Sequence, residues 1–148
     1  ATRQTSGRYL VQLLAVRPIA FDRVRTMLAP DELDEEDRGI YVRMLESYDR
    51  AGPAGLEADL ADYPPDVEGL IRRAWADPPP NVDDELAEEL AMRVRLNYMK
   101  GMESGIIREL TEAERSRDSE KAVRIQSQLT EIGRAIAGLE KEILTSRV

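Results

Sequence analysis

The segment 122–143 constrains the fold more than any other part of the sequence. Its apolar residues recur at alternating steps of three and four, and they are Ala122, Ile125, Leu129, Ile132, Ile136, Leu139 and Ile143. On an α-helix this heptad spacing places all seven side chains in one stripe, the heptad seam. Burial of each large aliphatic side chain is worth about 1.5–3 kcal/mol, an upper range because the unfolded chain already hides some of that surface. The seam must therefore pack against another helix, a second copy or a partner.

Shorter amphipathic segments precede this helix. Apolar residues at helical spacing predict helices near residues 6–16, 31–51, 54–62 and 66–77, each of which ends close to a proline. The segment 21–30 is predicted as a loop or a short helical turn. No segment shows the alternation of period two that is typical of a strand. We therefore expect an all-α fold that begins as a compact bundle of short helices.

Beyond Pro80 the sequence contains no proline, which favours long helices. A helix capped by Asn81 or Asp83 is predicted to run to about Arg117. A polar turn follows, in which Asp118 or Ser119 can cap the seam helix. The stripe that would face the seam across this hairpin comprises Met102, Ile106, Leu110 and Ala113. Gly101 and Gly105 each cost about 1 kcal/mol inside a helix and predict a joint there. The expected parts are a bundle, 1–100, and a C-terminal helical hairpin, 101–148.

The charge balance excludes several kinds of partner. The 148 residues include 29 acidic against 21 Lys and Arg side chains, which gives a net charge of −8. Binding to duplex nucleic acid or to an anionic membrane surface requires an excess of positive charge. We therefore expect a protein partner, with no direct nucleic-acid or membrane binding. The sequence has neither a signal peptide nor an apolar run of membrane-spanning length, which predicts a cytoplasmic protein. A first residue other than Met suggests that the chain is part of a longer protein.

Residues suited to catalysis are scarce. The chain contains no His and no Cys, so it lacks the most common general base, a thiolate nucleophile and the usual zinc ligands. The acidic runs 31–37 and 83–89 could hold Mg²⁺, but carboxylates are also favoured at helix N-termini, which is the interpretation that we prefer. No glycine-rich phosphate loop is present. The sequence predicts a non-catalytic chain without metal or cofactor.

Two stretches resemble the C-terminal domain of bacterial DNA primases. The segment 9–18, YLVQLLAVRP, resembles the leucine-rich opening helix of that domain. The segment 84–144 resembles its closing part. In that part a long helix leads into a hairpin, and the turn of the hairpin follows a charged stretch. The resemblance extends over nearly the whole chain from about Arg8. It implies a non-catalytic domain that docks onto the N-terminal region of the replicative DNA helicase, with the zinc-binding and polymerising domains upstream.

The resemblance also implies where docking occurs. Because the terminal hairpin is the main docking element of the family, we expect the contact at the end of the seam helix, with apolar and basic members Ile136, Leu139, Ile143, Leu144, Arg134, Lys141 and Arg147. Trp75 is either a core residue of the bundle or an anchor of a second contact. If the chain is such a domain, a joint at Gly101 and Gly105 would let the bundle and the hairpin contact the same helicase.

Two other readings remain open from the residues alone. The seam could pair with its own copy in a self-associating coiled-coil protein, including a domain-swapped homodimer through the 100–105 joint. An adaptor of an unrelated complex would share the same acidic, all-α character. The seam could equally be covered within the hairpin, by the bundle or by a partner.

Overall fold

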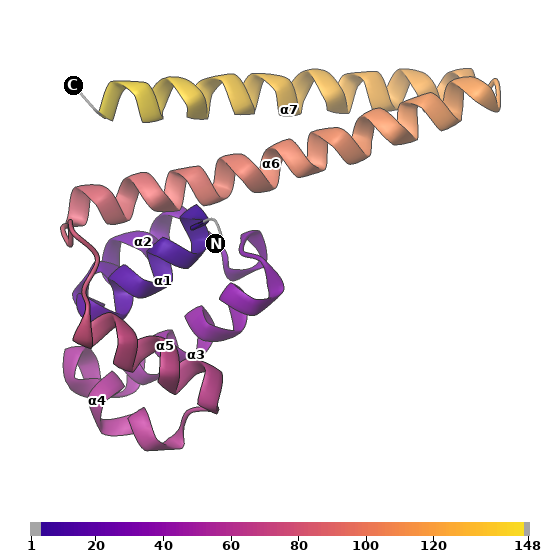
Figure 1. Ribbon diagram of the computed structural model, residues 1–148. Helices are drawn as coiled ribbons and strands as arrows, with labels where there is room; N and C mark the ends of the chain where they lie inside the picture. Colours follow the sequence, from indigo (N-terminus) through magenta and orange to yellow (C-terminus); the bar gives the residue numbers. More distant parts are fainter. Residues whose placement is uncertain (1–3, 147–148) are drawn as a thin grey trace. The chain divides into compact units, whose positions relative to one another are not determined.

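The computed structural model describes residues 4–146, and all of the regular elements in this range are helices (Figure 1). The α-helices are α1 (Ser6–Val16), α2 (Phe21–Met27), α3 (Glu35–Ala51), α4 (Gly55–Asp59), α5 (Pro65–Ala76), α6 (Asp84–Arg115) and α7 (Ser119–Ser146). Short 3₁₀ turns lie at 18–20, 30–32, 52–54 and 60–62. The predicted all-α fold, with short helices followed by a long helix and a hairpin, is confirmed.

The chain divides into two compact units, unit 1 (1–94) and unit 2 (95–148). The division falls six residues before the boundary that the sequence suggested, and it lies within α6. Gly101 and Gly105, the predicted joint, are helical residues inside α6. A Cβ at Gly101 would meet nothing within 4 Å, and one at Gly105 would make only an ordinary contact with Arg108. Although glycine lowers the stability of a helix, α6 has no break at either position.

Local signals set most of the helix ends in unit 1. The Thr5 hydroxyl caps α1 by accepting a hydrogen bond from the backbone N–H of Arg8 at 3.1 Å. Helix α3 ends at Gly52, whose φ of 71° is a conformation that glycine adopts without strain. For the segment 21–30 the sequence left a loop or a short helical turn open, and in the structure residues 21–27 form a helix of seven residues, α2. Its Phe21 and Val24 are completely buried, so tertiary packing stabilises a segment whose local sequence is only weakly helical.

The core of unit 1 is aliphatic with one aromatic cluster. Fully buried side chains come from all five helices α1 to α5 and from the start of α6, and include Leu10, Leu13, Leu14, Phe21, Val24, Ile40, Met44, Leu56, Ile71, Ala87 and Ala91. The ring of Phe21 meets that of Tyr41 edge-on, with 5.3 Å between centroids, and that of Tyr48 at 5.6 Å. Burial raises the pKa of Tyr41 to about 12, so this phenol stays neutral inside the bundle.

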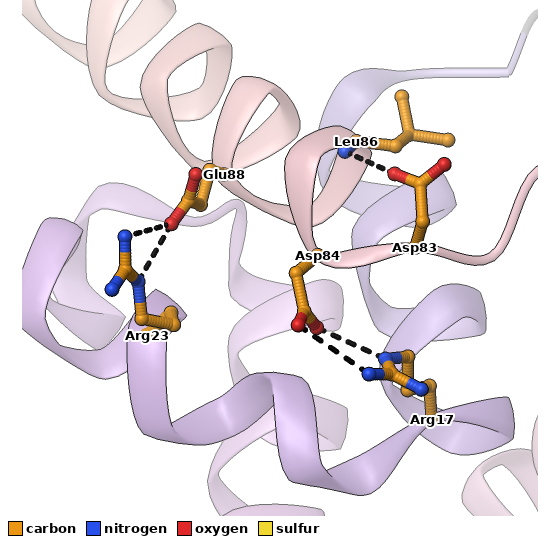
Figure 2. Close-up of polar contacts among 6 residues, drawn as sticks. All are labelled: Arg17, Arg23, Asp83, Asp84, Leu86 and Glu88. Carbon is orange, nitrogen blue, oxygen red and sulfur yellow. Dashed lines mark hydrogen bonds and ion pairs between the residues drawn. The ribbon is translucent and has the colours of Figure 1, made fainter.

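The first turns of α6 are tied to α1 and α2 by charged side chains (Figure 2). The Asp83 carboxylate caps α6 by accepting a hydrogen bond from the backbone N–H of Leu86 at 2.7 Å. Arg17 donates to both oxygens of Asp84, with Nε 2.9 Å from Oδ1, and Arg23 donates to Glu88 at 2.7 Å. The hydrogen bond raises the pKa of Arg17 and lowers that of Asp84. The acidic run at the start of α6 thus contributes a cap and two interhelical pairs, all within unit 1.

Candidate functional site

The hairpin of unit 2 is closed by a turn of three residues, Ser116 to Asp118. The backbone N–H of Asp118 donates to the carbonyl of Ala113 at 3.0 Å, which closes the end of α6. Arg117 adopts a left-handed conformation with φ 58°, a position usually taken by glycine. The Asp118 carboxylate then accepts from the backbone N–H of Lys121 at 3.2 Å and caps α7, as the sequence suggested. The chain therefore reverses direction within about one helical turn.

Helices α6 and α7 run antiparallel beyond this turn (Figure 1). Four residues of the heptad seam are buried, namely Ile125, Ile136, Leu139 and Ile143 at 4, 6, 9 and 5% exposure. Ala122, Leu129 and Ile132 are half-buried. On α6, Leu96 and Ala113 are buried, and Met99, Ile106 and Leu110 are half-buried. The seam is therefore largely covered within one chain, and Lys100 Nζ lies 3.8 Å from Glu140 Oε2 across the hairpin.

The predicted docking residues divide into two groups. The first group, Ile136, Leu139 and Ile143, belongs to the heptad seam, and these side chains are buried. Leu144, by contrast, is 67% exposed, and Arg134 and Lys141 are exposed on the same helix. Arg147 lies outside the described residues. Only the second group is accessible to a partner while the hairpin is closed.

Trp75, near the end of α5 in unit 1, lies partly in the bundle and partly at its surface. Its indole Nε1 donates to the carbonyl of Ala15 on α1 at 2.8 Å, so it helps to hold two helices together. The same side chain is 38% exposed, so it is not a fully buried core residue. Partial exposure with a satisfied N–H leaves one ring surface available for contact.

Several exposed apolar residues on the hairpin were not singled out as site candidates. Tyr98, Ile107 and Val123 are 41, 47 and 66% exposed. Met102 was predicted to lie in the stripe that faces the seam, but it is 43% exposed. Residues 98 and 102 lie one turn apart on the same side of α6. The heptad pattern could not identify them because it finds the most regular stripe, whereas these residues lie beside it.

Metal-binding groups, membrane-spanning helices and similarity to known proteins give no further indication of function. Within residues 4–146, no group of three or more acidic side chains is placed to hold a metal ion. Over the same residues, no helix has the length and apolar character needed to cross a membrane. Neither family models, curated proteins nor solved structures gave a significant match to the chain.

Proposed function

We propose that this chain is a non-catalytic docking module, the helicase-binding domain of a bacterial DNA primase. The observation that carries the proposal is the layout of the chain, with a bundle of short helices, a long α6 and an antiparallel α7 whose end bears the exposed Leu144 one turn after the exposed Lys141. This is the arrangement that the sequence resemblance to primase C-terminal domains implies. Docking would raise the local concentration of primase at the unwinding fork, even if each single contact is weak.

The docking surface in this proposal is narrower than the sequence alone suggested. Ile136, Leu139 and Ile143 support the hairpin from inside, while Leu144 and the neighbouring Lys141 contact the helicase. Arg134, two turns earlier, contributes charge at the rim. An exposed apolar side chain with cationic neighbours suits a partner surface that is apolar at its centre and acidic at its edge.

The test replaces Leu144 by aspartate in the full chain. Because this side chain is 67% exposed, the Leu144→Asp variant should fold normally and bind the N-terminal domain of the replicative helicase at least about tenfold more weakly. Binding is measured by calorimetry, with co-elution in light scattering as a second readout. Val123→Asp is the matched control, because Val123 is 66% exposed on the same helix but near the hairpin turn.

The two variants separate the competing readings. If Val123→Asp binds like the parent and Leu144→Asp does not, the end of α7 is the docking surface. If neither change affects binding, the surface lies elsewhere, and if the parent does not bind the helicase at all the proposed function fails. The self-association reading predicts a stable dimer of the chain alone, whereas the seam in this structure is already covered within one chain.

A further inference from the structure

Negative charge is concentrated in unit 1. Residues 1–94 contain 20 acidic and 11 basic side chains, a net charge of −9, whereas residues 95–148 contain 9 acidic and 10 basic side chains, a net charge of +1. The acidic character of the whole chain therefore belongs to the bundle. A surplus of this size attracts basic partners and repels acidic ones over distances of about a Debye length, roughly 8–10 Å at physiological salt.

Unit 1 contains an open cavity of about 850 Å³, and several of its acidic residues line this cavity. We call it the bundle groove, and it lies between the start of α1, the first turn of α3 and the end of α5. Its lining combines apolar residues, including Leu70, Ala74 and Pro79, with carboxylates and two arginines. A cavity of this size accommodates several residues of an extended peptide. A mixed lining of this kind also matches peptides that contain both aliphatic and charged residues.

The two arginines of the bundle groove already have protein partners. Arg8 Nη2 lies 3.1 Å from Glu36 Oε1 and 3.0 Å from the Oδ1 atom of the buried Asp37. The Nε atom of Arg73 donates to the carbonyl of Gly69, one turn earlier in α5, at 3.2 Å. Arg8 is therefore neutralised by two carboxylates. The positive charge left for a ligand is smaller than two unpaired arginines would provide.

Two carboxylates of the bundle groove lack such partners, and both stand at helix ends. Asp34 is the N-cap residue of α3, but its side chain makes no capping hydrogen bond. Asp77 is the C-cap residue of α5, where the negative end of the helix dipole disfavours a carboxylate. Both residues are exposed, and neither takes part in an ion pair within the described part of the chain. A cation beside Asp77 would meet both the carboxylate and the negative helix end.

We propose that the bundle groove binds a basic, extended peptide segment of a partner protein. Arginine or lysine side chains of that segment pair with Asp34 and Asp77, and an aliphatic side chain between them contacts the apolar part of the lining at Leu70 and Ala74. Charge complementarity argues for this occupant, because the groove offers two unpaired carboxylates within a unit of net charge −9. The site is separate from the end of α7 and does not depend on helicase binding.

The test is a calorimetric titration of the full chain with three blocked peptides at low ionic strength. The basic probe is acetyl-RLGRLG-amide, and its neutral and acidic counterparts carry Gln or Glu in place of Arg. The fluorescence emission of Trp75 provides a second readout, because its sequence neighbours Ala74 and Ala76 both line the groove. We expect the basic peptide to bind, the neutral one to bind about tenfold more weakly, and added salt to weaken binding.

Variants locate the binding. The double variant Asp34→Asn with Asp77→Asn should lower the affinity for the basic peptide about tenfold. The control variant Glu57→Gln with Asp62→Asn removes the same charge from exposed positions outside the groove, and it should change this affinity less than about twofold. Circular dichroism verifies that both pairs fold. Equal effects of the two pairs, equal binding of the neutral peptide, or absence of binding by the basic peptide would each overturn the proposal. Tighter binding of the acidic peptide would overturn it in favour of a site governed by Arg8 and Arg73.

Discussion

At the scale of single residues, Gly55 allows a close approach between two helices of unit 1. Helix α4 begins at Gly55, where an added Cβ would lie 2.2 Å from the backbone carbonyl oxygen of Ser47 on α3. A backbone oxygen at this distance cannot move aside without a shift of the helix. The absence of a side chain at Gly55 therefore sets how closely α3 and α4 approach each other.

Replacement of Gly55 by alanine should lower the free energy of unfolding by about 1–3 kcal/mol, because α4 must move away from α3. Urea unfolding followed by circular dichroism measures the change. Gly39→Ala in the middle of α3 is the control, since a Cβ there meets nothing within 4 Å and should stabilise the helix by up to about 1 kcal/mol. Equal effects of the two substitutions would show that the α3–α4 contact is looser than described.

Asp37 gives the bundle a specific dependence on pH. Burial raises the pKa of this carboxyl above its ordinary value of 3.8, Arg8 opposes the rise, and Asp34 and Glu36 add to it. Between 3.8 and the raised pKa the folded chain binds more protons than the unfolded chain. The contribution of Asp37 to the free energy of unfolding therefore falls as the pH rises through this window.

Asp37→Asn removes this titration. We expect the stability of the parent relative to the variant to decrease from about pH 3 towards neutral pH, as the buried carboxyl ionises. Urea midpoints of both proteins across that range measure the difference. A difference that stays constant with pH, or that grows in favour of the parent, would contradict the stated direction.

At the scale of helices, the sequence predicted most elements and failed where packing decides. The seam helix and its cap at Asp118 follow from local signals alone. The sequence could not decide between a loop and a short helical turn at α2, because buried Phe21 and Val24 stabilise this helix through tertiary contacts. Met102 was misplaced because helical periodicity gives the direction of a side chain but not the width of the opposing helix. What covers the seam could not be predicted, since an apolar stripe is compatible with any apolar partner.

The uninterrupted α6 leads to a prediction about its glycines. Gly101→Ala together with Gly105→Ala should raise the free energy of unfolding by about 1–2 kcal/mol, because both positions are helical and have space for a methyl group. Urea unfolding followed by helical circular dichroism measures this gain. If the glycines act as a joint during docking, the same variant will also weaken helicase binding, and unchanged binding would remove that role.

At the scale of the whole chain, the two units differ in how much of their surface is buried. Unit 1 contains a contiguous core to which α1, α2, α3 and α5 all contribute, whereas the hairpin turn around residues 115–121 is exposed throughout. Regions with few buried contacts open locally at low free-energy cost. The bundle and the end of the hairpin should therefore open at different rates.

Amide hydrogen exchange measures this difference. We expect the slowest exchange at helical amides of the core, such as those of Leu14, Met44 and Ile71, and much faster exchange in residues 115–121. The site predicted from the sequence would be affected unequally, since its buried members exchange slowly and Leu144 near the chain end exchanges fast. Uniform protection along α7 would mean that the hairpin is as stable as the bundle.

The unequal division of charge between the two units also determines how the molecule meets a charged solid. On an amine-coated biosensor chip, the bundle with its net charge of −9 would adsorb while the nearly neutral hairpin would not. The chain would then be immobilised through unit 1 without a tag. A chip coated with carboxylate would retain little protein, because unit 1 is repelled and unit 2 has almost no net charge.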